Sequence, residues 1–173
     1  DPLWPDVVDG AEGVIHTPQG EVAVVVHRRD LRRDPSVRGI VTTLRDVTAE
    51  RELQRDLAYR ASHDELTGMA NARAWGETLE REQDRRRGAG NGVAVIFIDL
   101  DEFKDINDRY GHPTGDQVLA EMARRIRECV RAGDVAARVG GDEFAVLLRG
   151  LPHVDDARAI AQRMAEVLSQ PTV

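Results

Sequence analysis

Residues 134–150, DVAARVGGDEFAVLLRG, place two glycines and two acids between two apolar runs. Apolar runs on both sides of a glycine-containing turn are typical of a β-hairpin. Because Gly140 and Gly141 have no side chains, the turn can be tight and a ligand can approach its backbone closely. Asp142 and Glu143 follow at once. We therefore expect a hairpin that carries two carboxylates at its tip, at the edge of a buried sheet.

A third acid closes another apolar run. Residues 92–100, GVAVIFIDL, are apolar up to Asp99, which predicts a strand covered on both faces. If this strand neighbours the hairpin, Asp99, Asp142 and Glu143 converge at one edge of the sheet. Three such carboxylates repel one another unless a cation lies between them, and Mg²⁺ favours oxygen ligands, water and substrate phosphates. The alternative is a solvated hairpin turn with ordinary acids.

Helical patterns around these strands predict an α/β (α+β) domain with a central sheet flanked by helices. Helices are expected at about residues 71–87, from 115 to 133 with Gly133 ending the helix, and at about 155–170. Their inward-facing residues would be Trp75, Leu79, Val118, Leu119, Met122, Ile126, Val130, Ile160, Met164, Val167 and Leu168.

The N-terminal part has a different pattern. Residues 1–46 alternate turn signals with β-branched runs, and EVAVVV and GIVTTL predict two antiparallel strands that need more sheet around them. Residues 48–62 lack Gly and Pro and begin with a capping Thr48, which predicts a helix. A narrow apolar stripe runs along it: Leu53, Leu57 and Ala61. This helix is either a linker packed on its own domain or a dimeric coiled coil.

Composition limits the classes of protein. The chain has 173 residues, enough for one ordinary domain or a small domain plus a fragment, and a formal charge of −7. That charge argues against binding nucleic acid through bulk electrostatics, although a divalent ion could still bridge acids to phosphate. The single Cys129 excludes an internal disulfide. With neither a membrane segment of about 18 apolar residues nor a signal-like N-terminus, we expect a cytoplasmic, reducing location.

Four motifs resemble, in order and spacing, the GGDEF domains of bacterial diguanylate cyclases. They are HDELTG (63–68), FIDLDEFKDINDRYGHPTGDQVL (97–119), RAGD (131–134) and RVGGDEFAVLL (138–148). A shorter stretch, GIVTTLRDVTAERELQ (39–54), is similar to the end of a PAS sensor domain that runs into its signalling helix.

The resemblance implies a nucleotidyl-cyclase or palm-like sheet flanked by helices, preceded by a partial antiparallel PAS sheet. It divides the chain into a PAS-like fragment (1–46), a signalling linker helix (47–62) and a GGDEF domain (63–173) that is incomplete at its C-terminus.

The resemblance further implies an enzyme that condenses two GTP molecules into cyclic di-GMP and two pyrophosphates, with one GTP on each domain of a homodimer. At the matching positions, Mg²⁺, or Mn²⁺ in its place, would be bound by Asp99, the Leu100 carbonyl, Asp142 and Glu143. Asp142 would also help to deprotonate the attacking 3′-hydroxyl, and Lys104 would stabilise the phosphates. These metal ligands include the three acids expected from the residues alone. Their role also fits the chemistry, because metal ions stabilise the charge that develops on the α-phosphate and lower the pKa of the hydroxyl.

Asn107 and Asp116 match the pair that reads guanine in the family. Guanine offers N1–H and N2–H to a carboxylate, whereas ATP would leave the acid unpaired. Asp116 is alternatively a first-turn acid that stabilises the helix after it, and both roles are compatible. Phe103 is expected to pack while the amides around it face phosphate. Gly140 and Gly141 would let the triphosphate approach the turn.

Arg131 and Asp134 match the RxxD pair that forms the inhibitory product site in relatives. An arginine can stack on guanine and bond its O6 and N7, while the acid accepts N1–H and N2–H. The alternative is a helix-end arginine beside a C-cap glycine. Cyclic di-GMP is therefore expected both as product and as feedback inhibitor.

Two departures from the family pattern bear on activity. Ala72 stands where the family usually has arginine, and the chain stops at SQPTV (169–173), where the family continues into another strand and helix. We expect this chain alone to bind GTP weakly and to make little cyclic di-GMP. The alternative function is a catalytically silent GGDEF domain that senses GTP or cyclic di-GMP for another module, such as a downstream phosphodiesterase. His112 is expected in a polar loop, and the sensor signal and cofactor are left open.

Overall fold

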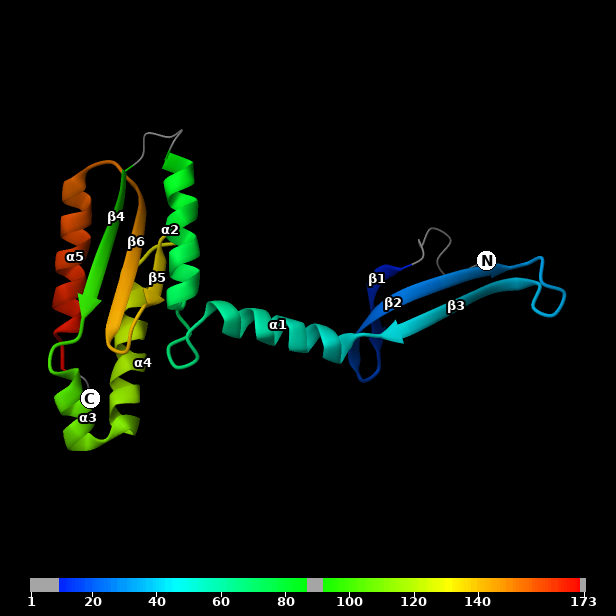
Figure 1. Ribbon diagram of the computed structural model, residues 1–173, viewed down its shortest axis with the longest axis horizontal. Coiled ribbons are helices and arrows are strands. Elements are labelled where there is room, and N and C mark those ends of the chain that lie inside the picture. The colour runs from blue at the N-terminus through cyan, green and yellow to red at the C-terminus, as the bar shows by residue number, and fades with distance from the viewer. Residues whose placement is uncertain (1–9, 87–91, 172–173) are drawn as a thin grey trace. The chain divides into compact units, whose positions relative to one another are not determined.

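The computed structural model describes residues 10–86 and 92–171. The chain divides into two compact units, residues 1–58 and 59–173. Figure 1 shows that each unit contains its own sheet, and every strand pairing in the described residues is antiparallel apart from isolated bridges.

The first unit has one sheet, in the order β1-β2-β3. Its described elements are β1 (Ala11–Thr17), β2 (Gly20–Leu31), β3 (Gly39–Asp46) and most of α1 (Thr48–Ser62). The two predicted antiparallel strands correspond to β2 and β3. The additional strand β1 was not predicted, because its sequence AEGVIHT has only a weak apolar alternation. Its pairing with β2, for example Val14 opposite Ala23, supplies part of the extra sheet that a two-stranded ribbon needs.

The second unit has a sheet in the order β4-β6-β5. Its described elements are α2 (Ala72–Arg86), β4 (Gly92–Asp99), α3 (Phe103–Tyr110), α4 (His112–Cys129), β5 (Val135–Arg138), β6 (Glu143–Leu151) and α5 (Val154–Leu168). The quoted stretch forms the expected hairpin: β5 and β6 pair from Val135 opposite Leu147 to Arg138 opposite Phe144.

The central strand β6 is buried on both faces. Successive side chains of a strand point to opposite faces, so Phe144, Val146 and Leu148 pack with α4 and α5, where Met164 is nearly inaccessible. Ala145 and Leu147 pack on the other face, against α2. The predicted inward residue Trp75 of α2 is buried there. Because both faces of this strand are apolar, helices cover the sheet on both sides (Figure 1).

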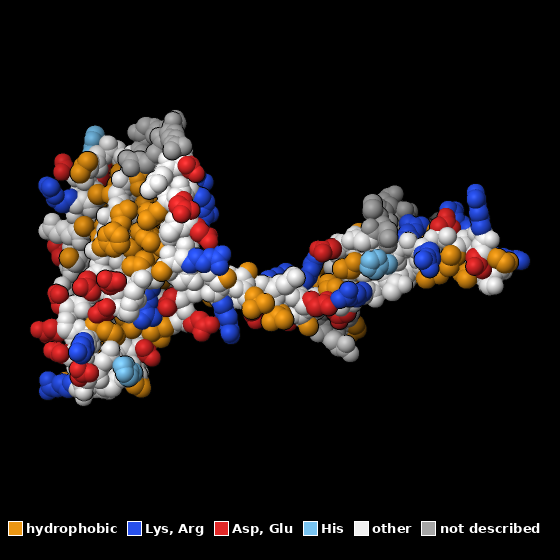
Figure 2. Space-filling model, viewed as in Figure 1, with side chains coloured by type: hydrophobic (Ala, Val, Ile, Leu, Met, Phe, Trp, Pro, Cys, Tyr) orange, Lys and Arg blue, Asp and Glu red, His pale blue; other side chains and the backbone are white. Residues whose placement is uncertain are grey.

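The prediction that residues 92–100 form a strand covered on both faces is wrong for the described structure. β4 lies at the edge of the sheet, and its burial alternates along the strand. Ile96 and Ile98 pack on the core, whereas the Phe97 residue is 71% exposed. Figure 2 shows hydrophobic side chains gathered over this part of the unit. A continuous apolar run in the sequence allows a strand to be buried on both faces, but it does not establish that other elements cover both faces.

The helix expected from residue 115 to 133 has different limits. α4 begins at His112 and ends at Cys129, because Pro113 fits the first turn of a helix and Val130 is already extended. His112 therefore starts a helix instead of lying in a polar loop. A separate helix, α3, precedes it, and Gly111 with φ of 83° provides the sharp turn between them.

The last helix matches the prediction in position but buries less than expected. At its N-terminus the His153 amide donates to the Asp156 carboxylate at 3.0 Å, which satisfies one of the free amides there. Met164 is buried, while Ile160, Val167 and Leu168 are only half-buried.

Candidate functional site

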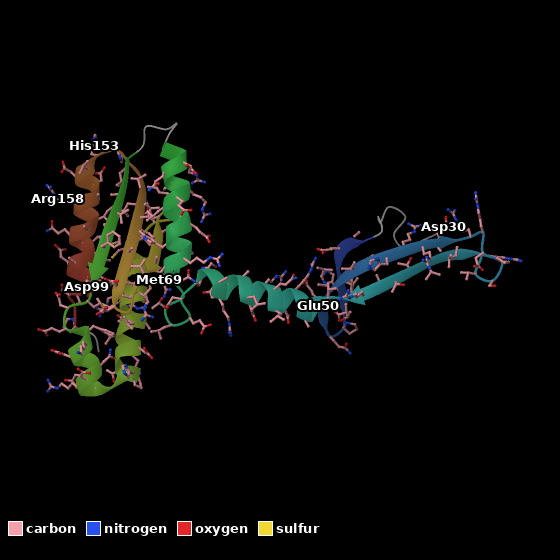
Figure 3. All side chains as sticks on the ribbon, viewed as in Figure 1. Asp30, Glu50, Met69, Asp99, His153 and Arg158 are labelled. Carbon is pink, nitrogen blue, oxygen red and sulfur yellow. The ribbon has the colours of Figure 1, made fainter. Side chains whose placement is uncertain are left out.

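The sheet brings the predicted acids to one edge. Asp99 ends β4 and lies directly opposite Glu143, the first residue of β6. Directly opposed residues of an antiparallel pair project to the same face, so these two carboxylates share a face, and Asp142 immediately precedes Glu143 in the turn. Figure 3 labels Asp99 at this end of β4, and Figure 2 shows acidic side chains gathered in the same region.

Gly140 leaves room for the side chain of Glu143. A Cβ atom at residue 140 would lie 2.3 Å from Oε2 of Glu143 and 3.1 Å from its Cβ. The Val139 amide also donates to the Glu143 carbonyl at 2.9 Å, which closes the turn. At Gly141, by contrast, an added Cβ would meet no atom within 4 Å. The first glycine therefore makes room for the carboxylate, and the second leaves open space beside the turn.

Arg138 links this turn by hydrogen bonds to a loop that is distant in the sequence. Its guanidinium donates to the Gly141 carbonyl at 2.7 and 3.1 Å and to the Asp64 carboxylate at 3.1 and 3.2 Å. Asp64 also accepts from the Thr67 amide at 2.9 Å and from its hydroxyl at 2.6 Å. Arg138 itself has a φ of 49°, an unusual value for a residue with a side chain.

The ionisation of Asp64 reflects these contacts. Partial burial favours the neutral acid, but hydrogen bonds from Thr67 and Arg138, together with the Arg138 charge, outweigh it and lower the pKa of Asp64 below its ordinary value. The charged form of Asp64 is thus the one that holds the turn.

The donor set at the sheet edge suits a hard divalent cation. The three acids and the Leu100 carbonyl offer only oxygen. Within the described ranges no three His, Cys, Asp or Glu side chains are gathered closely enough to hold a metal ion by themselves. A Mg²⁺ ion needs no such cage, because it commonly takes one or two carboxylates and completes its shell with water and phosphate oxygens. The residues therefore fit a magnesium ion that arrives with a phosphate ligand.

The segment after β4 leads from the acids into α3. The Leu100 carbonyl accepts the Phe103 amide at 3.4 Å, and Glu102 has a φ of 59°. Phe103 is half-buried against the core, as expected, and Lys104 is exposed in the first turn of α3. A cleft of about 620 Å³ passes Asp99 and Leu100 and is walled mainly by apolar side chains of β4, α3, α4 and α5.

Asn107 lies against the first turns of α4. A Cβ atom at Gly115 would be 2.0 Å from Oδ1 of Asn107 and 3.2 Å from Cζ of Phe103. The buried Gly115 therefore allows the two helices to approach closely, and Asp116 is the next residue, exposed to solvent. The structure brings the two predicted guanine-binding residues to the same helix junction.

Arg131 and Asp134 lie at the opposite end of β5 from the glycine turn. The Arg131 side chain is 60% exposed, whereas the Asp134 side chain is only 3% exposed. The carboxylate of Asp134 accepts the Arg149 amide at 3.1 Å and the Arg131 amide at 3.3 Å. A ligand in solvent would thus reach Arg131 directly, while Asp134 is turned towards the backbone.

Two of these contacts were not predicted from the sequence. Asp64 and Arg138 both lie inside recognisable motifs, but no spacing rule links residues 74 positions apart. The contacts of Asp134 with main-chain amides also leave no signal in the sequence. A membrane-spanning helix, long and apolar enough to cross a bilayer, is not found in the described part of the chain.

Comparisons with known proteins agree on the second unit. The family model described as "Diguanylate cyclase, GGDEF domain" matches residues 61–173. The probable diguanylate cyclase DgcE of Escherichia coli K12 is 40% identical over 136 residues, which cover 79% of this chain and 12% of that protein. The cyclic di-GMP phosphodiesterase PdeB of Shewanella oneidensis is 36% identical over 140 residues, covering 81% of this chain and 15% of PdeB. The match thus involves a small part of each relative.

The fold is also similar to solved structures. The crystal structure of the coiled coil and GGDEF domain of DgcB from Caulobacter crescentus, in complex with c-di-GMP, superposes with a TM-score of 0.64 at 30% identity. The superposition covers 68% of this chain and 61% of the DgcB chain. The predicted α/β fold is confirmed by this similarity.

Proposed function

The chain belongs to the GGDEF domain family of diguanylate cyclases, and from that membership we propose that it condenses two GTP molecules into cyclic di-GMP and two pyrophosphates, in a Mg²⁺-dependent homodimer. The observation that carries the proposal is the pairing of Asp99 with Glu143 beside the glycine turn that carries Asp142. An edge of this kind offers oxygen donors next to open backbone, as a metal-bound triphosphate requires.

Each part of the substrate has a candidate partner in the proposal. Asn107 and Asp116 would bind the guanine edge at the junction of α3 and α4. Backbone amides near Phe103, together with Lys104, would hold the phosphates. Gly141 would allow the triphosphate to lie close to the turn, because an added side chain there meets only open space.

The chemistry is an exchange of one phosphorus–oxygen bond for another. The 3′-oxygen of one GTP attacks the α-phosphorus of the other, and the bond to the β-phosphate breaks to release pyrophosphate. Asp142 would take the proton of the 3′-hydroxyl. Mg²⁺, held by Asp99, Asp142, Glu143 and the Leu100 carbonyl, would stabilise the charge on the α-phosphate and lower the pKa of the hydroxyl. Two such exchanges close the ring.

Control would come from the N-terminal unit. We infer that residues 1–46 belong to a PAS-like sensor and that α1 transmits its signal. A dimer is needed because each domain would supply one GTP, and binding both near each other provides the proximity that the reaction needs. The product would bind at the turn of Arg131 and Asp134, with the exposed Arg131 guanidinium as its direct contact, and limit further synthesis.

A second candidate is a domain that does not turn over GTP but senses it, or cyclic di-GMP, for another module. The similarity to PdeB, which is named a phosphodiesterase, favours it. The presence of Asp99, Asp142 and Glu143 argues for the cyclase, since a sensor has no need of all three metal ligands.

A single assay distinguishes the two candidate functions. The full-length protein is incubated with GTP and Mg²⁺, and cyclic di-GMP is measured by chromatography. Accumulation of cyclic di-GMP with release of pyrophosphate supports the cyclase. GTP that binds but remains unconverted over hours would favour the sensor.

A further inference from the structure

The turn that carries Arg131 and Asp134 is held by one residue of β6. Arg149 uses both of its main-chain groups: its amide donates to Asp134 at 3.1 Å, and its carbonyl accepts the Arg131 guanidinium at 2.6 Å. Its side chain donates to the Gly133 carbonyl at 2.9 Å. Arg149 therefore contacts three of the four residues in the RxxD turn.

The same guanidinium is anchored to α2. Nε of Arg149 lies 2.8 Å from Oε1 of Glu82, although its N–H is not directed at that oxygen. The Glu82 side chain is only 10% exposed and the Arg149 side chain is 29% exposed. Arg85, one turn further along α2, is 3.5 Å from the same carboxylate oxygen. Glu82 therefore fixes the direction in which the Arg149 side chain points.

A buried carboxylate is retained in a core only with a partner, because an uncompensated charge there is costly. This ion pair joins α2 to the strand behind the turn. Gly133, with a φ of 106°, is by itself a flexible point in that turn. The bond from Arg149 to its carbonyl restrains the turn at this glycine.

From this network we propose that Glu82 and Arg149 are positioning residues of the product site, which act through the RxxD turn without touching the ligand. This inference rests on the proposed function, since it assumes that Arg131 binds cyclic di-GMP. Arg149 holds the turn in the conformation that presents the Arg131 guanidinium to solvent, and Glu82 holds Arg149. Binding to a preorganised group loses less conformational entropy.

The test separates stability from product affinity. Variants Arg149→Met and Glu82→Gln/Arg149→Met are prepared in the full-length, nucleotide-free protein. Affinity for cyclic di-GMP is measured by calorimetry and stability by the midpoint of thermal unfolding. Arg73→Met with Glu77→Gln is the matched control, because this pair is also on α2 but exposed.

The expected results differ between the two readouts. Arg149→Met lowers the unfolding midpoint because it leaves the Glu82 charge with only the exposed Arg85 as a partner, and the double variant recovers most of that loss because it removes the charge. Both variants lack the bond to Gly133, so both bind cyclic di-GMP about 3- to 10-fold more weakly, the equivalent of one net hydrogen bond. The control keeps the wild-type midpoint and affinity.

Two other results would overturn the proposal in different ways. If product affinity returns to wild type together with the midpoint in the double variant, or never changes, Arg149 is only a structural residue. If the wild-type protein itself does not bind cyclic di-GMP, the product site is wrong and its positioning residues are wrong with it.

Discussion

At the scale of single residues, the glycine turn shows how neighbouring side chains divide their roles. Glu143 occupies the space beside Gly140, and Arg138 binds the carbonyl of Gly141. Asp142 stands between these restrained residues. Its backbone is thus held from both sides, which suits the role of proton acceptor that we propose for it.

The first prediction concerns Asp142. Asp142→Asn should reduce cyclic di-GMP synthesis by roughly 100-fold or more, because it would remove both a proposed metal ligand and the proposed proton acceptor. The unfolding midpoint should stay near that of wild type, since Asp142 is not a core residue. Synthesis is followed by chromatography with GTP and Mg²⁺. Asp155→Asn, at a highly exposed acid of α5, is the control and should keep full activity.

The second prediction concerns the pH dependence of the Asp64–Arg138 contact. The pKa of Asp64 is lowered in the folded protein, so its charge stabilises the fold above the unfolded-state pKa of about 3.9, and that contribution is lost as pH falls through the lowered value. Asp64→Asn should therefore unfold at a lower temperature than wild type at pH 7, and the two midpoints should converge below about pH 4. A difference that stays constant from pH 7 to pH 3 would show that the charge of Asp64 is unimportant.

These residues also mark the limit of sequence reasoning. The pattern of acids and glycines was enough to place Asp99, Asp142 and Glu143 at one sheet edge, because strand ends and turn glycines are local signals. The bond from Arg138 to Asp64 joins residues brought together only by the fold. The burial of Asp134 could not be predicted either, because its carboxylate accepts hydrogen bonds from main-chain amides, and every residue except proline has such an amide.

At the scale of elements, the close contact between α3 and α4 depends on Gly115. Gly115 is buried and lets Asn107 lie against α4. The sequence predicted a helix after Gly115, but α4 begins at His112. Pro113 in its first turn is itself a start signal, which the prediction overlooked. Where a helix begins depends here on Gly111 and on the packing of α3, which periodicity alone does not report.

The third prediction tests this junction. Gly115→Ala should displace Asn107, since the new Cβ would lie 2.0 Å from its Oδ1. We expect kcat/KM for GTP to fall about 10- to 100-fold, the effect of misplacing a substrate contact. Asn107→Ala should give a comparable loss without any steric conflict, which covers the case in which Gly115→Ala folds poorly.

Gly76→Ala on α2 is the matched control for that substitution. An added Cβ at Gly76 would meet no atom within 4 Å, so alanine should stabilise the helix by about 0.5–1 kcal/mol and leave kcat/KM unchanged. Wild-type kinetics for both Gly115→Ala and Asn107→Ala would show that Asn107 is not part of the proposed guanine site.

At the scale of the whole molecule, α1 is the element whose role the sequence left open. It spans the boundary between the two compact units, and within the described residues none of its side chains is buried. Leu53 is 60% exposed and Leu57 is 58% exposed, one turn apart on the same helix face. Such a stripe favours association with a second helix, because two copies side by side would remove these leucines from water.

The fourth prediction therefore concerns assembly. Leu53→Ser/Leu57→Ser should shift the full-length protein towards monomer in sedimentation experiments and lower its rate of cyclic di-GMP synthesis most strongly at low protein concentration. In the proposed mechanism two GTP-loaded domains must meet before either 3′-hydroxyl can reach the other α-phosphate, so a loss of association lowers the rate even though the residues of each site are unchanged. Glu52→Ser/Asp56→Ser, with the same spacing one position earlier on α1, is the control and should sediment and turn over as wild type. Should the leucine variant remain dimeric with an unchanged rate at every concentration, α1 would be a linker helix of its own domain, and the two substrates would have to be brought together by another surface.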